Sequence, residues 1–163
     1  MVATWNPAAA SSYYTRQRET EYYAGSGEPS GIWYAPAGDF GLVDSSFVDR
    51  ATFDRLYHAR DESGSPLLEQ IRRHKERTPA FDITLSAPRS VGVVWGLAPY
   101  DTKRLIEAAQ QKAVRATLSM LEREATWARR GRNGAFLEKV ALTSATFRHG
   151  ESRPAQHSDG KVF

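Results

Sequence analysis

The stretch from Tyr100 to Arg130 contains neither glycine nor proline, and its apolar residues recur at close to the helical period. These residues are Leu105, Ala109, Ala113, Ala116, Met120 and Leu121. The pattern predicts one long helix that begins with Asp101 or Thr102 as its cap and ends at Gly131. It is the longest element that the sequence predicts.

Residues 80–86, AFDITLS, are the clearest predicted strand. From 81 to 86 the odd-numbered residues are apolar and the even-numbered ones polar, Asp82 among them, so one face is apolar and the other polar. Pro88 ends the strand, and Ser90 is predicted to cap a short helix through VGVVWGLA.

The remaining elements are shorter and are separated by turn residues such as GSGEPSG at 25–31. They are predicted as a helix over 8–24, an extended segment with a turn over 31–43, a short amphipathic helix over 49–58, a helical or irregular stretch over 66–79, and one or two strands over 135–152. The chain shows no internal repeat.

Composition narrows the class of protein. The chain has 163 residues, enough for one domain with a sizeable core and too few for two ordinary ones. Hydrophobic residues make up 40% and charged residues 25%, which argues against a disordered tail or a membrane protein. No secretory signal pattern opens the sequence. There is no cysteine, which suits the cytoplasm and leaves only histidine and carboxylate side chains as metal ligands.

The net charge of +3 is modest, but its distribution is uneven. The last third is rich in arginine, at positions 115, 123, 129, 130, 132, 148 and 153. The arginine-rich last third of the chain could lie along a nucleic-acid phosphate backbone. An ordinary solvated helix face explains the same charges equally well.

Four of the seven tyrosines form two adjacent pairs, Tyr13 with Tyr14 and Tyr22 with Tyr23. A phenol titrates near pH 10, so it is a poor nucleophile at neutral pH unless a base or cation stabilises its anion. Tyrosines that pack a helix against a sheet are the commoner explanation of such pairs.

Three further features offer chemistry that is unspecific when each is taken alone. Asp82, on the polar face of its strand, could orient a histidine or accept a proton from a tyrosine. Arg89 and Ser90, in SAPRS, could hold phosphate oxygens. His149, in TFRHGES, could bind a metal, although a lone histidine is more often structural.

Taken in order, the two tyrosine pairs, FDITLSAPRSVGVVWGL and ATFRHGESRP resemble the start of a conjugative relaxase of the multi-tyrosine TrwC/TraI type. The resemblance extends over most of the chain and is weakest in residues 31–75. It implies an α+β fold of the palm type, with an antiparallel sheet flanked by helices. Arg89 stands where lysine is more usual, and the pairs are one residue further apart than expected.

The resemblance implies strand-specific nicking of plasmid DNA at a transfer origin. Tyr13 would attack the scissile phosphate and form a 5′-phosphotyrosine link, and Tyr22 would be the second nucleophile when the strand is rejoined. Asp82 matches the family aspartate that supports the site. His149 matches the first of three histidines that bind a divalent metal, with Mg²⁺ or Mn²⁺ expected.

The family's other two metal histidines lie in an H-x-H segment, which residues 1–163 do not contain. We therefore expect the N-terminal portion of a single relaxase domain, without a helicase domain, that binds metal weakly and nicks DNA slowly or not at all. The alternative is a non-catalytic single-stranded DNA-binding or accessory protein derived from a relaxase.

The expected partners are single-stranded DNA at a plasmid transfer origin and other relaxosome proteins, with no membrane. Five arginines are candidate phosphate contacts: Arg89, Arg115, Arg129, Arg130 and Arg132. Ser90 joins them as a DNA-binding candidate, and Trp95 or Trp127 could stack on bases, although either is more often a core residue.

Overall fold

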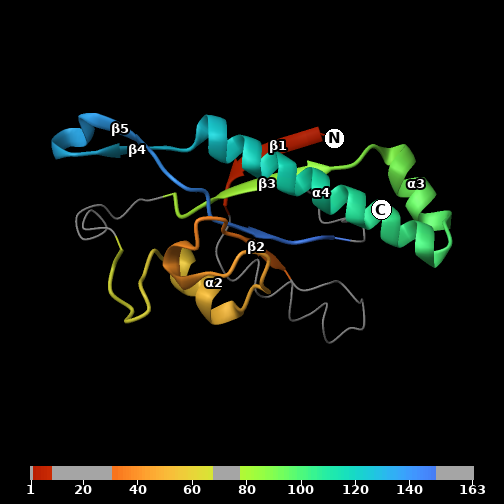
Figure 1. Ribbon diagram of the computed structural model, residues 1–163, viewed down its shortest axis with the longest axis horizontal. Coiled ribbons are helices and arrows are strands. Elements are labelled where there is room, and N and C mark those ends of the chain that lie inside the picture. Colours follow the sequence, from red (N-terminus) through yellow and green to blue (C-terminus); the bar gives the residue numbers. More distant parts are fainter. Residues whose placement is uncertain (1, 9–30, 68–77, 150–163) are drawn as a thin grey trace, which may run out of the picture.

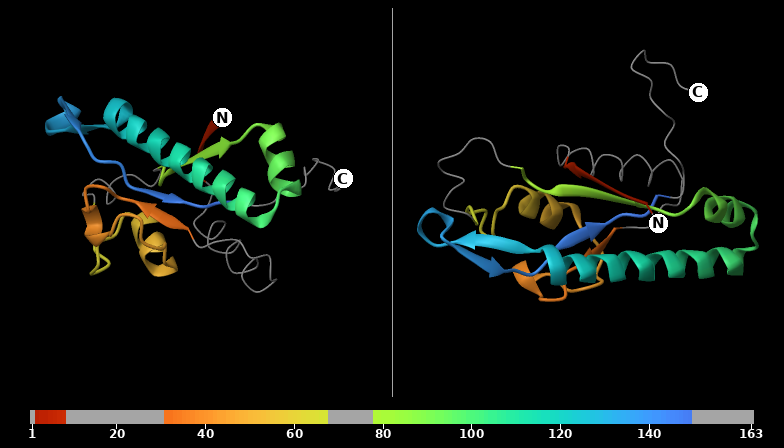
Figure 2. Two further views of the ribbon diagram at one scale, coloured as in Figure 1. Left: turned by 45° about the vertical axis from the view of Figure 1, so that its right-hand side comes forward. Right: turned by 90° about the horizontal axis from the view of Figure 1, so that it is seen from above.

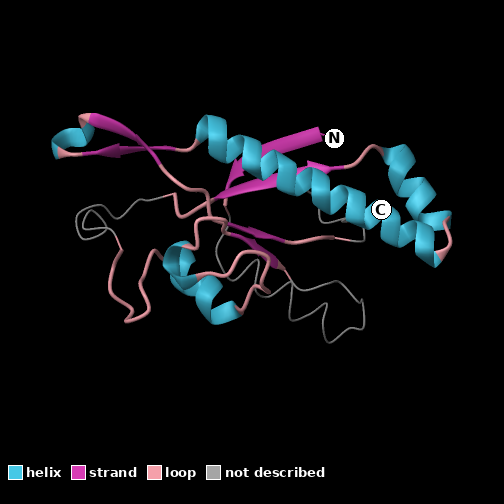
Figure 3. Cartoon of the chain, viewed as in Figure 1, coloured by secondary structure: helices cyan, strands magenta, loops and turns pink. Residues whose placement is uncertain are grey.

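The computed structural model describes residues 2–8, 31–67 and 78–149, and its elements mix helices with antiparallel strands (Figures 1 and 3). In chain order they are β1 (Val2–Pro7), β2 (Ile32–Tyr34), the 3₁₀ turn η1 (Asp39–Gly41), α2 (Arg50–Tyr57), β3 (Phe81–Ser86), α3 (Arg89–Leu97), α4 (Tyr100–Ala125), β4 (Trp127–Arg130), the 3₁₀ turn η3 (Arg132–Gly134), β5 (Phe136–Lys139) and β6 (Ser144–Thr146). The predicted α+β class with antiparallel pairing is confirmed.

The described strands form three two-stranded antiparallel sheets: β1 with β3, β2 with β6, and β4 with β5. The first pair runs in register from Val2 opposite Ser86 to Pro7 opposite Phe81. Seen from above, α4 runs along one side of the molecule and the β1–β3 pair along the other (Figure 2). The β4–β5 hairpin projects beyond the end of α4, and α3 lies at the opposite end of that helix (Figure 1).

The buried core lies around β2 and the segments packed on it. Trp33, Ala35, Leu42 and Val48 are almost fully buried, and Phe53, Leu56, Ala145 and Phe147 pack against them. Thus α2 and the strand β6 close over the same apolar centre, although nearly ninety residues of sequence lie between them. The core depends on this long-range pairing of β2 with β6.

Helix α2 forms as the sequence predicts. Asp49 caps it, because its carboxylate accepts a hydrogen bond from the backbone N–H of Thr52 at 2.8 Å. The apolar face of the predicted strand at 80–86 is only partly covered. Phe81, the first residue of β3, remains 57% exposed with its ring against Trp5.

The long helix is five residues shorter than predicted. It ends at Ala125, because Thr126 takes an extended backbone conformation. The Thr126 hydroxyl lies 2.7 Å from the carbonyl oxygen of Glu122 and 2.6 Å from that of Val140. Arg129 and Arg130 therefore lie on the strand β4, paired with β5, and not on the last turn of a helix.

The predicted helix caps at Ser90 and at Asp101 or Thr102 are wrong. Both α3 and α4 begin directly after a proline, Pro88 and Pro99, whose fixed φ of −56° and −59° suits the residue before a helix. No side chain caps either helix, and Ser90 is the second residue of α3.

Gly31 approaches the ring of Phe147 so closely that an added Cβ would lie 2.5 Å from the ring carbon Cε1. Gly31→Ala should therefore displace Phe147 and lower the free energy of unfolding by about 1–3 kcal/mol. Denaturant unfolding followed by circular dichroism measures this. Gly92→Ala, on α3 with nothing within 4 Å of an added Cβ, is the control. It should be neutral or stabilising by about 0.5–1 kcal/mol, and equal loss in both variants would contradict the prediction.

Candidate functional site

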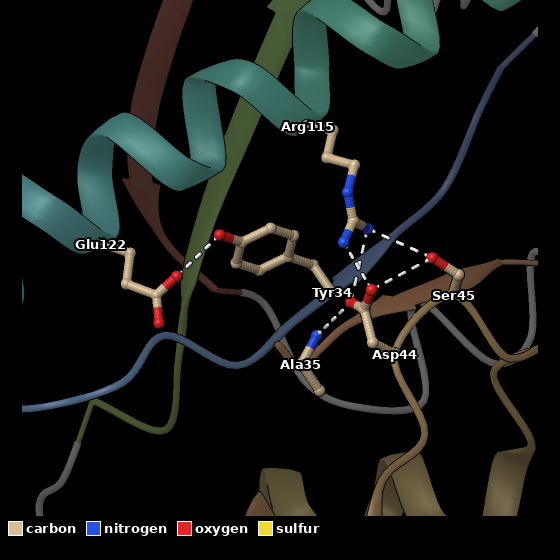
Figure 4. Close-up of polar contacts among 6 residues, drawn as sticks. All are labelled: Tyr34, Ala35, Asp44, Ser45, Arg115 and Glu122. Carbon is tan, nitrogen blue, oxygen red and sulfur yellow. Dashed lines mark hydrogen bonds and ion pairs between the residues drawn. The ribbon is translucent and has the colours of Figure 1, made fainter. Parts of the chain in front are cut away.

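A polar network fastens α4 to β2 (Figure 4). Tyr34 is buried, and its hydroxyl donates a hydrogen bond of 2.6 Å to Oε2 of Glu122 on α4. The other oxygen of Glu122 accepts from the backbone N–H of Leu142 at 3.3 Å. Burial, followed by the bond to Glu122, raises the pKa of the Tyr34 phenol above its ordinary value. Tyr34 therefore stays protonated as a hydrogen-bond donor and is no candidate nucleophile.

Arg115 and Asp44 form the second half of this network. The Arg115 guanidinium is paired with the Asp44 carboxylate and lies 5.3 Å from the centroid of the Tyr34 ring. Asp44 also accepts a 3.0 Å hydrogen bond from the backbone N–H of Ala35. Arg115, predicted as a phosphate contact, is thus engaged in holding α4 to the loop after β2.

A third carboxylate joins three elements at the other end of α4. Glu107 Oε1 accepts a 3.0 Å hydrogen bond from the indole N–H of Trp95 on α3. Glu107 Oε2 accepts a 2.5 Å ion-paired hydrogen bond from Arg148, which follows β6. The Arg148 contact is the main cause that lowers the pKa of the Glu107 carboxyl, so Glu107 is ionised at neutral pH.

We define the basic hairpin as β4, η3 and β5 (residues 127–139), and most of its described side chains are exposed. It carries Arg129, Arg130 and Arg132 together with Trp127, whose side chain is 55% exposed. Arg130 is paired with Glu138 at 2.8 Å. Within the described part of the chain neither Arg129 nor Arg132 has a carboxylate partner. The hairpin therefore presents positive charge to solvent, together with the Trp127 ring, over which Lys139 Nζ lies 4.8 Å from the centroid.

The other described candidates lie on separate elements. Asp82 is half-buried on β3, opposite Asn6 of β1. Arg89 and Ser90 are exposed at the start of α3. His149 is exposed just after β6, the partner strand of β2, whereas Asp82 lies on β3, which pairs with β1. The pairing of β4 with β5 gathers the hairpin arginines.

The predicted nucleophiles Tyr13 and Tyr22 lie outside the described residues, as do the predicted helix over 8–24 and most of the stretch at 66–79. Their roles stay predictions.

Residues 2–8, 31–67 and 78–149 contain no group of three or more histidine, aspartate or glutamate side chains placed to hold a metal ion. The described ranges contain two histidines, His58 and His149, so they cannot form a three-histidine site by themselves. In the same ranges, no helix is both long and apolar enough to cross a membrane.

Sequence reasoning did not single out Glu107, Glu122, Tyr34 or Asp44. A carboxylate on the inner side of a long helix is the pattern that could have pointed to Glu107 and Glu122. Their partners are 12 to 88 residues away, however, and local periodicity does not identify them.

Comparison with known proteins identifies the family. A profile described as TrwC relaxase matches residues 7–160. Because the match covers nearly all of the sequence, the chain belongs to the TrwC relaxase family, as the motifs predicted. By family, such proteins act as DNA strand nucleases and transferases in conjugation, bind single-stranded DNA at the transfer origin and generally use a divalent metal. A search of curated proteins finds no match.

The Asp44–Arg115 pair makes the free energy of unfolding depend on pH. The bond from Arg115, then that from Ala35, lowers the pKa of Asp44 below its ordinary 3.8. A carboxyl with a lowered folded pKa stabilises the fold above the unfolded pKa, and this stabilisation is lost as the pH falls through the folded pKa. Asp44→Asn should cost about 1 kcal/mol at pH 7, and the cost should shrink below about pH 4.

Unfolding of wild type and variant in denaturant at pH 7 and pH 3 measures this difference. Glu124→Gln, which removes an exposed pair with the neighbouring Arg123, is the control and should change little at either pH. An Asp44→Asn cost that is the same at both pH values would rule out the titrating pair as its source.

Proposed function

We propose that this chain acts as the nicking domain of a conjugative relaxase, cutting one DNA strand at a transfer origin through a phosphotyrosine intermediate. The observation that carries the proposal is the family match over residues 7–160. That range includes both tyrosine pairs, the D-x-T-x-S segment of β3 and the F-R-H segment after β6. The reaction belongs in the cytoplasm, where plasmid DNA lies.

In the proposed reaction the Tyr13 phenol loses its proton and its oxygen attacks the scissile phosphorus. The new Tyr–O–P bond replaces the P–O3′ bond, and the departing 3′-oxygen takes up a proton to become a free hydroxyl. The energy of the phosphodiester is kept in the 5′-phosphotyrosine link. Tyr22 can repeat the exchange on a second strand when transfer ends, so one covalent link is resolved without a nucleotide cofactor.

Asp82 is proposed to support this reaction from β3. Its carboxylate is half-buried, and its backbone is fixed by the pairing of β3 with β1, where Asp82 lies opposite Asn6. Such a carboxylate can orient a histidine or accept the phenol proton.

The DNA strand is proposed to contact two groups of cations. Arg89 and Ser90 begin α3 near one end of α4, and the basic hairpin lies beyond its other end (Figure 1). With 26 residues at about 1.5 Å each, α4 is about 39 Å long. A strand that reaches both groups must therefore track along much of the molecule, with Trp127 available for base stacking.

The alternative is a non-catalytic single-stranded DNA-binding or accessory protein derived from a relaxase. Both hypotheses predict binding of single-stranded DNA. Only the enzyme predicts a covalent tyrosine–DNA adduct.

Incubation with an origin oligonucleotide and Mg²⁺ or Mn²⁺ should yield a covalent adduct at Tyr13, detected by mass spectrometry of the peptide. The yield should be low, because residues 1–163 contain one histidine of the expected three-histidine set. Tyr13→Phe should abolish the adduct and Tyr14→Phe should leave it. An adduct that survives Tyr13→Phe would refute the assignment, and rapid, complete cleavage would refute the expected weak metal site.

The double variant Arg129→Gln/Arg132→Gln should weaken binding of single-stranded DNA and flatten its salt dependence. Each lost phosphate contact lowers the slope of log K against log salt by about 0.7, so the pair should lower it by about 1.4. Fluorescence anisotropy of a labelled oligonucleotide at several salt concentrations measures the slope. Arg104→Gln, on the first turns of α4, is the matched control. If Arg104→Gln alone lowers the slope by about half as much as the double variant, the hairpin is not a specific contact.

A further inference from the structure

Glu107 is the point at which three elements of the described chain meet. One carboxylate oxygen accepts a 3.0 Å hydrogen bond from the indole N–H of Trp95 on α3. The other lies 2.5 Å from a guanidinium nitrogen of Arg148. Each oxygen thus serves a different segment. Lys103, on the same helix, lies 5.3 Å over the Trp95 ring and covers it further.

The two segments joined in this way carry predicted DNA-contacting or site residues. Trp95 lies on the same short helix as Arg89 and Ser90, which begin it. Arg148 directly precedes His149 and directly follows Phe147, whose ring packs on the core. A helix and a strand end that are far apart in sequence are therefore fixed to one carboxylate on α4.

The geometry has an energetic consequence. The Glu107 and Arg148 side chains are only 27% and 39% exposed, so their contact is partly shielded from water. A charge-assisted hydrogen bond in such a setting is stronger than a surface ion pair. Loss of the carboxylate would release both segments at once, whereas loss of the indole N–H would release α3 alone.

We propose that Glu107 is a positioning residue that fixes the start of α3, with Arg89, relative to the Arg148–His149 segment, so that one DNA strand can contact both. The inference rests on the proposed function for its DNA part. Glu107 itself touches no DNA in this proposal and acts through Trp95 and Arg148. Its removal should therefore act on DNA binding as if the Arg89 contact had been lost.

The first test measures hydrogen–deuterium exchange in Glu107→Met, which keeps the length of the side chain and removes both acceptor oxygens. Exchange in residues 89–97 and in 144–149 should both rise, by about tenfold where a charge-assisted bond is lost. The basic hairpin should not change. Trp95→Phe should raise exchange in 89–97 only. Glu124→Met, the same substitution further along α4, should raise neither.

The second test is a double-mutant cycle on the salt dependence of single-stranded DNA binding. Arg89→Gln should lower the slope of log K against log salt by about 0.7, the value for one phosphate. In Glu107→Met the slope should already be lower by about that amount, and adding Arg89→Gln should lower it no further. A variant that was only less stable would lose affinity and still show the full effect of Arg89→Gln.

Raised exchange in both segments together with a non-additive cycle supports the inference. Unchanged exchange in either segment, or a full Arg89 effect within Glu107→Met, overturns it. If the wild-type chain shows no preference for single-stranded DNA, the proposed function fails, and the exchange pattern alone then decides whether Glu107 joins the two segments.

Discussion

The Glu122 carboxylate of α4 is the contact on which the arrangement of the described elements most depends. It accepts hydrogen bonds from the buried Tyr34 of β2 and from the backbone of Leu142, which leads into β6. Two-stranded sheets are at best marginally stable alone, and the described strands form three of them. Because Glu122 binds the β2 side and the β6 side together, α4 acts as the common support of the β2–β6 core.

The acidic side chains near α4 are largely occupied by structural contacts, and this determines where free positive charge remains. Asp44 is paired with Arg115, Glu107 with Arg148, and Glu122 with Tyr34. By contrast, the described residues offer no carboxylate to two of the hairpin arginines. The net charge of +3 therefore understates the local potential of the hairpin. A polyanion could therefore contact guanidinium groups there that no described carboxylate pairs.

The sequence predicts those elements whose causes are local. The alternation at 81–86 gives β3, and Asp49 gives the start of α2 through a capping bond three residues away. The predicted end of α4 at Arg130 was wrong, because the helical pattern of the sequence continues past Thr126. Its hydroxyl contact with Val140, 14 residues on, and the pairing of β4 with β5 outweigh that periodicity.

The residues of the candidate site likewise fall into those that local motifs predict and those that depend on partners distant in sequence. Motif order is a property of the sequence, so the family and the residues Asp82, Arg89 and His149 could be proposed from it. Whether an arginine is available to DNA depends on partners distant in sequence. Arg115 looked equivalent to Arg129, yet Asp44, 71 residues away, engages the former. The supporting carboxylates Glu107 and Glu122 were missed for the same reason.

The two ends of α4 have different roles. Glu107 stands in the early turns of the helix and gathers α3 and the Arg148–His149 segment, whereas Thr126 ends the helix and begins the hairpin. Because α4 is about 39 Å long, it separates α3 and the Arg148–His149 segment from the hairpin cations. Under the proposed function, the hairpin then adds affinity by contacting the DNA strand at phosphates other than those near Arg89.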